Sequence, residues 1–248
     1  MIEKKYFILA SIIALLIILT FFLVRPTKEK PIDKTICDRL AASQSKDICH
    51  ILLSGDPTLC SKVSEGYSTV CYEIVLDPSK VSENLCNSLS DDYGKKLCFK
   101  NLAIKLKKPE FCMNDDDCYL DLAQTTRNPV LCEKFPSDST MMFECLALAQ
   151  GDRKNCDMIQ DDGKRRSCMG LLPLSLDDCL LFGYYNYDCV KKLAYQKDDA
   201  SICEKIDKEK LKFDCILNVR NDLMICDTAN DVAKDFCLLY YLRNAMRG

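Results

Sequence analysis

The sequence lacks the histidines, close cysteine couples and concentrated basic charge on which many active and binding sites depend. Its 248 residues contain one histidine, His50, so a Ser-His-Asp triad or a Cys-His pair would have to use it. No two cysteines stand in a C-x-x-C pattern, which argues against a zinc site and against a thioredoxin-like redox motif. We therefore expect a protein that is not an enzyme and that has no metal site and no cofactor.

The charge is nearly balanced, with 34 Lys and Arg against 37 Asp and Glu, a net charge of −3. Residues 1–34 hold six basic and three acidic side chains and carry +3, so the other 214 residues carry −6. Nucleic-acid binding needs a concentrated basic face, which a mildly acidic remainder does not supply. We therefore expect no nucleic-acid partner.

There is one long hydrophobic run, the nineteen uncharged residues from Tyr6 to Val24. As a helix it would span the ~30 Å hydrocarbon core of a bilayer. No A-x-A-like cleavage site follows it, so we predict an uncleaved transmembrane anchor at residues 6–24 rather than a signal peptide. Residues 1–5 are then a short N-terminal tail and residues 25–32 a stalk. The first cysteine, Cys37, stands too far beyond the run for a lipoprotein-type anchor.

Basic residues flank the run on both sides, so the positive-inside rule does not orient the anchor. The eighteen cysteines indicate the orientation of the anchor, because persistent disulfides belong to oxidising spaces outside the cytoplasm. We expect a single-pass membrane protein with an extracytoplasmic ectodomain, residues 33–248.

The cysteines recur with a period near 24 residues. Taken in sequential twos, their first members lie 23, 26, 26, 20, 24, 23, 24 and 23 residues apart. The nine pairs, which we number unit 1 to unit 9, are Cys37–Cys49, Cys60–Cys71, Cys86–Cys98, Cys112–Cys118, Cys132–Cys145, Cys156–Cys168, Cys179–Cys189, Cys203–Cys215 and Cys226–Cys237. We predict disulfides within these pairs. The rival scheme, which joins the second cysteine of one unit to the first of the next, would leave Cys37 and Cys237 unpaired.

Each unit shows the pattern of a helix, a turn and a second helix. The residue four positions before the first cysteine is a good N-cap type in eight units, Lys108 of unit 4 being the exception. These N-cap residues are Asp33, Asp56, Ser82, Asn128, Asp152, Ser175, Asp199 and Asp222. Turn formers such as Gly163 lie between the cysteines, and apolar residues follow the second cysteine at helical spacing, as in Phe99, Leu102 and Ala103.

The predicted fold class is therefore all-α: a transmembrane helix followed by a disulfide-stapled array of hairpins, each with two helices of eight to ten residues. The array resembles tetratricopeptide-type α-solenoids in kind, but that consensus is absent and the period is near 24 rather than about 34. Residues 33–248 also resemble uncharacterised prokaryotic membrane-anchored proteins with cysteine-paired helical-hairpin repeats. This second resemblance implies the fold and brings no assigned activity.

Two features remain as candidates for contact with other molecules. An aromatic cluster in unit 7 could contact a partner, with packing in the core and turn as the alternative, and it comprises Phe182, Tyr184, Tyr185 and Tyr187. The acidic run Asn114 to Asp117 lacks the spacing of an EF-hand loop, so we interpret it as a solvated turn. His50 occupies a position that other units fill with Tyr72 or Phe99, so we expect it to pack on the second helix.

The function that fits these features best is a non-catalytic binding or scaffolding protein. Stapled repeats would hold an extended surface rigid for protein partners, and residues 6–24 would hold it at a membrane. Two alternatives stay open. One is a structural component of a cell-envelope assembly, and the other is a cell-surface enzyme with paired carboxylates such as Asp177 and Asp178.

Overall fold

The computed structural model describes residues 34–248 except 65, 173–174, 181–186, 221 and 248. Residues 34–248, which contain all nine units, form one compact region, distinct from residues 1–33. The predicted anchor at residues 6–24, with its tail and stalk, lies outside the described residues. In the part that is described, no helix is both long and apolar enough to cross a bilayer.

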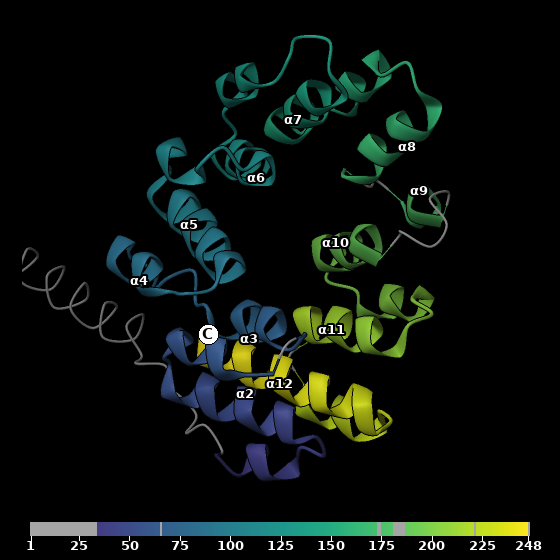
Figure 1. Cartoon of the computed structure of the whole chain (residues 1–248). Helices are drawn as coiled ribbons and strands as arrows, with labels where there is room; N and C mark the ends of the chain where they lie inside the picture. Colours follow the sequence, from purple (N-terminus) through teal and green to yellow (C-terminus); the bar gives the residue numbers. More distant parts are fainter. Residues whose placement is uncertain (1–33, 65, 173–174, 181–186, 221, 248) are drawn as a thin grey trace, which may run out of the picture. The chain divides into compact units, whose positions relative to one another are not determined.

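The described elements are helices, two in each unit (Figure 1), and no strand occurs among these residues. The first helices are η1 (Lys34–Arg39), η2 (Pro57–Lys62), α4 (Glu83–Ser88), η3 (Pro109–Cys112), η4 (Pro129–Lys134), η5 (Arg153–Met158), α9 (Leu176–Leu180), η7 (Ala200–Lys205) and η8 (Leu223–Thr228). The second helices are α2 (Ser43–Ser54), α3 (Ser68–Val75), α5 (Asp92–Leu106), α6 (Asp116–Thr126), α7 (Thr140–Gln150), α8 (Asp162–Gly170), α10 (Tyr187–Lys197), α11 (Glu209–Arg220) and α12 (Asp231–Arg247). The all-α hairpin repeat is confirmed.

The predicted N-caps explain where the first helices begin. A side-chain oxygen accepts a hydrogen bond from a backbone N–H two or three residues ahead in seven units. The capping residues are Asp56, Ser82, Asn128, Asp152, Ser175, Asp199 and Asp222. Lys108 gives no side-chain cap, and Asp33 lies outside the described residues.

The first helices are shorter than the predicted eight to ten residues, and most are 3-10 helices of six residues or fewer. In units 2, 5 and 6 the helix ends at an apolar residue three positions after the first cysteine. At Val63, Phe135 and Ile159 the backbone leaves the helical region for an extended conformation. Each of these side chains is buried, so burying it ends the helix after about two turns.

The second helices carry the apolar face that the sequence predicts. In unit 3, Leu102 is 3% exposed and Ala103 fully buried, and the same positions are buried in units 4 and 7. The expectation for His50 is wrong, because this side chain is exposed on α2. The buried face of α2 is formed by its neighbours Ile48, Cys49, Ile51 and Leu52, and His50 lies outside that face.

The eighteen cysteines form the nine sequential pairs, with S–S distances between 1.95 and 2.11 Å. The Cα atoms of the pairs lie between 5.3 and 5.7 Å apart, within the usual range for a disulfide. Every cysteine is consumed, since none is left free. Each staple joins the first helix of a unit to its second helix, and Cys112–Cys118 does so despite the short interval between its cysteines.

The array also closes on itself, a contact that the sequence did not predict. Consecutive second helices pack on one another from α2 to α8 and again from α10 to α12, while α8 of unit 6 packs on α9, the first helix of unit 7. Helix α12 of unit 9 packs on α2 and α3 (Figure 1). In Figure 1 the last helix, in yellow, lies beside the first units, in blue. Units 1 and 9 are therefore neighbours, although they stand at opposite ends of the described chain.

Candidate functional site

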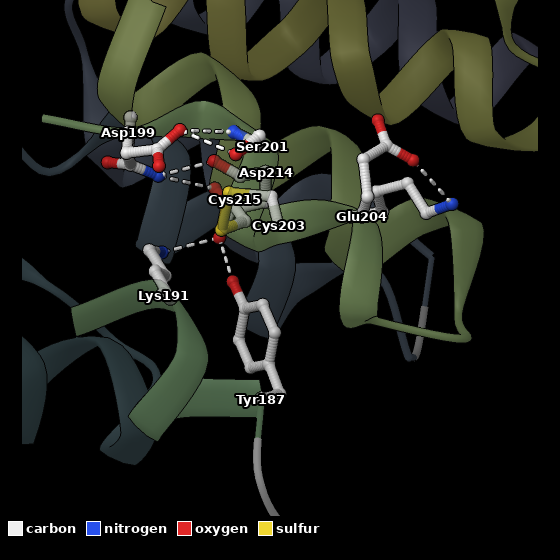
Figure 2. The surroundings of a disulfide bond; sticks show 10 residues. Tyr187, Lys191, Asp199, Ser201, Cys203, Glu204, Asp214 and Cys215 are labelled. Carbon is white, nitrogen blue, oxygen red and sulfur yellow. Dashed lines mark hydrogen bonds and ion pairs between the residues drawn. A yellow bond between two sulfur atoms is a disulfide. The ribbon is translucent and has the colours of Figure 1, made fainter. Parts of the chain in front are cut away.

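Asp214 of α11 is one of three polar side chains that are buried among the described residues. It is 5% exposed and directly precedes Cys215. Figure 2 shows Tyr187 and Lys191, both from α10, reaching its carboxylate beside the Cys203–Cys215 disulfide. We call this group, with Asn218 and Arg243, the Asp214 cluster.

The Asp214 cluster joins three units. Asn218, one turn ahead on α11, donates from Nδ2 to Oδ1 of Asp214 at 3.1 Å. Arg243 of α12 places its Nη2 atom 3.9 Å from the same oxygen. Tyr187 and Lys191 belong to unit 7, Asp214 to unit 8 and Arg243 to unit 9. A buried carboxylate is tolerated only where partners satisfy it, and here cations from both neighbouring units do so.

Burial shifts the pKa of three side chains near Asp214. It raises the pKa of Tyr187, and the nearby Asp214 carboxylate raises it further. Burial, helped by Asp214, raises the pKa of Tyr240 to about 12. Burial lowers the pKa of Lys210, against the opposing effect of Glu73 and Asp214. The two tyrosines remain neutral phenols at neutral pH, and the Asp214 carboxylate is fully engaged. The arrangement holds helices of three units together.

A cleft of about 610 Å³ lies between η7, α11 and η8. Its apolar lining includes Ala200, Phe213 and Ile216, all less than 9% exposed, while Met224 at the cleft is 76% exposed. An ion pair between Lys212 and Glu204, with Nζ and Oε2 3.2 Å apart, lies in the same lining. The volume falls within the roughly 300–1,000 Å³ of ligand sites, so the cleft can accept a small molecule or a few side chains of a partner.

Of the predicted aromatic cluster, Phe182, Tyr184 and Tyr185 lie outside the described residues, and their contact with a partner stays a prediction. Tyr187 is described and half-buried, with its hydroxyl donating to Asp214. Its ring also lies 5.5 Å from the Lys191 ammonium. Tyr187 therefore has a packing role inside the Asp214 cluster.

The paired carboxylates Asp177 and Asp178 are in different surroundings. Asp178 accepts two hydrogen bonds from the Arg153 guanidinium, at 3.1 and 3.2 Å, and one from the Ser175 backbone N–H at 2.9 Å. Asp177 is exposed on the same short helix. Asp178 therefore takes part in an inter-unit ion pair and in the start of a helix, and a catalytic role for the two carboxylates stays a prediction.

The acidic run in unit 4 is used locally. The Asp115 side chain accepts a hydrogen bond from the Cys118 N–H and caps α6, and Asp116 pairs with Lys134 at 3.0 Å. Within the described ranges, no three potential metal-ligating side chains gather at one point.

The sequence pointed to neither buried aspartate, Asp214 or Asp235. The position before the second cysteine is acidic in four units, where it is Asp117, Glu144, Asp188 or Asp214. Only in unit 8 is that side chain buried, because cations from units 7 and 9 meet there. The sequence pattern alone could not single out Asp214.

No family model matches the chain, and no curated protein or solved structure matches it either.

Proposed function

We propose that this chain is a non-catalytic, membrane-anchored protein whose ectodomain, residues 33–248, presents a rigid helical-repeat surface to protein partners outside the cytoplasm. The observation that carries the proposal is that every cysteine is consumed in a local staple. The thiols thus serve rigidity and offer no nucleophile or metal ligand. A stapled surface loses little conformational entropy when a partner binds, which favours its use as a binding platform.

The closed array supports the same role. Each unit is packed against two neighbours, and ion pairs such as Lys100–Asp121 and Arg153–Asp178 bridge consecutive units. The relative positions of surface side chains are therefore held over many units, as a scaffold requires. The cleft beside Met224 is a part of this surface with room for a partner's side chains.

In this proposal residues 6–24 anchor the chain and the cysteines oxidise in the extracytoplasmic space. Mass spectrometry of the chain extracted from its membranes should find the intact N-terminus. A mature chain that begins near Arg25 would contradict the anchor and leave the binding role standing.

The binding role is tested by photo-crosslinking in native membranes. A photoreactive phenylalanine analogue replaces Met224 at the cleft, or exposed Val130 or Met158 in other units, in the full-length chain. We expect a discrete adduct with a different protein from at least one position, and none with ordinary phenylalanine there. Adducts only between copies of this chain would support the structural-assembly alternative. The absence of adducts from correctly disulfide-bonded chains would contradict the proposal.

A further inference from the structure

The helix α2 of unit 1 begins without a cap of its own. The side chains of Asp91, Asp115, Ser139 and Asp161 cap the second helices of units 3 to 6. The corresponding residue before α2 is Ala42, which has no side chain that can accept a hydrogen bond. Ala42 therefore gives α2 no side-chain cap, just as Tyr67 gives none to α3 of unit 2.

The last unit supplies an acceptor for the backbone just before this helix. Asp235 of α12 accepts hydrogen bonds from the backbone N–H groups of Ala41 at 2.8 Å and Ala42 at 2.9 Å. Its side chain is 4% exposed. One carboxylate of unit 9 thus accepts hydrogen bonds from two backbone N–H groups of unit 1, at the opposite end of the sequence of repeats.

Further contacts surround Asp235. Arg39 of unit 1 donates from Nη2 to Oδ1 of Asp227 in unit 9 at 2.7 Å. At the other end of α12, Met246 lies with Leu52 and Val75 around a small hollow of about 50 Å³. Helices α2 and α12 therefore run in the same direction, with Asp235 at the start of the contact and Met246 at its end.

We propose that units 1 and 9 form a clasp, which can open as a whole and convert the closed array into an open one with all nine staples intact. Neighbouring units elsewhere are joined by the peptide chain, so opening their contacts cannot separate them. Units 1 and 9 have no such connection, and their contacts are hydrogen bonds, an ion pair and apolar packing. Opening the clasp uncovers the faces of α2, α3 and α12, while each unit keeps its own stapled conformation.

Two measurements on the full-length chain in detergent test the clasp. Spin labels attached through a ketone-bearing amino acid at exposed His50 and Ala245 report the distance between α2 and α12. In the labelled protein that keeps Asp235, the two labels should lie a short distance apart. Asp235→Ala should add a population of molecules in which this distance is longer. Amide exchange should accelerate roughly 10- to 100-fold in residues 41–54 and 231–247, because two hydrogen bonds to a charged group are lost, while units 4 to 6 keep their protection.

The matched control is Asp161→Ala, which removes the local cap of α8 and should accelerate exchange in that helix alone, with the label distance unchanged. If Asp235→Ala does not fold, Arg39→Ala decides, since this side chain is 36% exposed and should shift the labels in the same direction by less. An unchanged distance with unchanged exchange would overturn the proposal, and so would acceleration across all units together.

Discussion

Units 4 and 6 bring their paired cysteines to a similar distance, although the segments between the cysteines differ in length. Unit 6 has a capped first helix, a capped second helix and twelve residues of separation between its cysteines. Unit 4 has no cap at Lys108, a first helix of four residues and a separation of six. Even so, the Cα atoms of the two disulfides lie 5.4 Å apart in unit 4 and 5.6 Å apart in unit 6.

The difference shows that the staple, and not the length of the connection, defines the repeat. Unit 4 makes its short connection by placing Met113 and Asn114 in the left-handed region, with φ of 50° and 65°. Such a conformation costs a non-glycine residue about 1–2 kcal/mol. Unit 4 also holds an ion pair with each neighbour, Lys100–Asp121 and Lys134–Asp116. Unit 6 holds one such pair, Arg153–Asp178, with unit 7.

The largest effect is expected in unit 6. Replacing Cys156 and Cys168 by serine should lower the free energy of unfolding by about 2–5 kcal/mol, because the unfolded chain gains conformational entropy once the crosslink is removed. Denaturant unfolding measures this loss. Amide exchange should accelerate mainly in residues 152–172 and the adjoining helices, because stability in a repeat array is mostly local. Uniform acceleration across residues 34–248 would instead indicate a single cooperative core.

The corresponding change in unit 4 should cost less. Replacing Cys112 and Cys118 by serine frees a shorter loop and lets Met113 and Asn114 leave the left-handed region. We expect a loss about 1–2 kcal/mol smaller than in unit 6, from the same denaturant experiment. A loss of stability in unit 4 that equals or exceeds the loss in unit 6 would show that backbone strain between Cys112 and Cys118 does not offset the stabilisation by their disulfide.

A single substitution isolates that strain. Met113→Gly should raise the free energy of unfolding by up to about 1 kcal/mol, because glycine adopts a positive φ without the steric penalty. Met158→Gly in unit 6 is the matched control, since Met158 has similar exposure, 63% against 66%, and no left-handed backbone. The control should lose about 0.5–1 kcal/mol. A loss in both variants would contradict the assignment of strain to Met113.

The smallest effect is expected between these units, at Glu144 of α7. Burial raises the pKa of this carboxyl, and Lys164 of unit 6 only partly opposes the shift. The folded state therefore favours the neutral acid, a contribution that is present at low pH and is lost as the pH rises through the raised pKa. Glu144→Gln should raise the thermal midpoint relative to the parent at pH 7 and change it little at pH 4. An equal change at both pH values would exclude a titration effect, and Glu133→Gln at an exposed position is the control.

Much of the unit could be predicted from local sequence signals. The period, the N-caps and the apolar face of the second helix are patterns within a few residues, and Asp56, Asn128 and Leu102 behave as expected. The predicted length of the first helix was wrong, although the sequence contains a signal for the end of this helix. An apolar residue three positions after the first cysteine, such as Val63, marks where the helix ends.

Other features could not be predicted because no local pattern encodes them. Whether Asp214 is buried depends on Lys191 and Arg243, which other units supply. The contact of Asp235 with Ala41 joins residues 194 positions apart, and no sequence pattern near either residue predicts it. Local periodicity predicts the unit, while the contacts between distant units depend on the accumulated rotation from one unit to the next.

The nearness of paired cysteines also sets the order in which the chain can mature. Each bridge joins residues at most 13 positions apart, so both thiols leave the ribosome or translocon almost together. Synthesis at roughly 5–20 residues per second would release a complete new unit every few seconds, before the cysteines of the next unit compete. An oxidant that closes each bridge within this interval would produce the native pairing without reshuffling. The contact of Asp235 with Ala41 has to wait until almost the last residues have emerged.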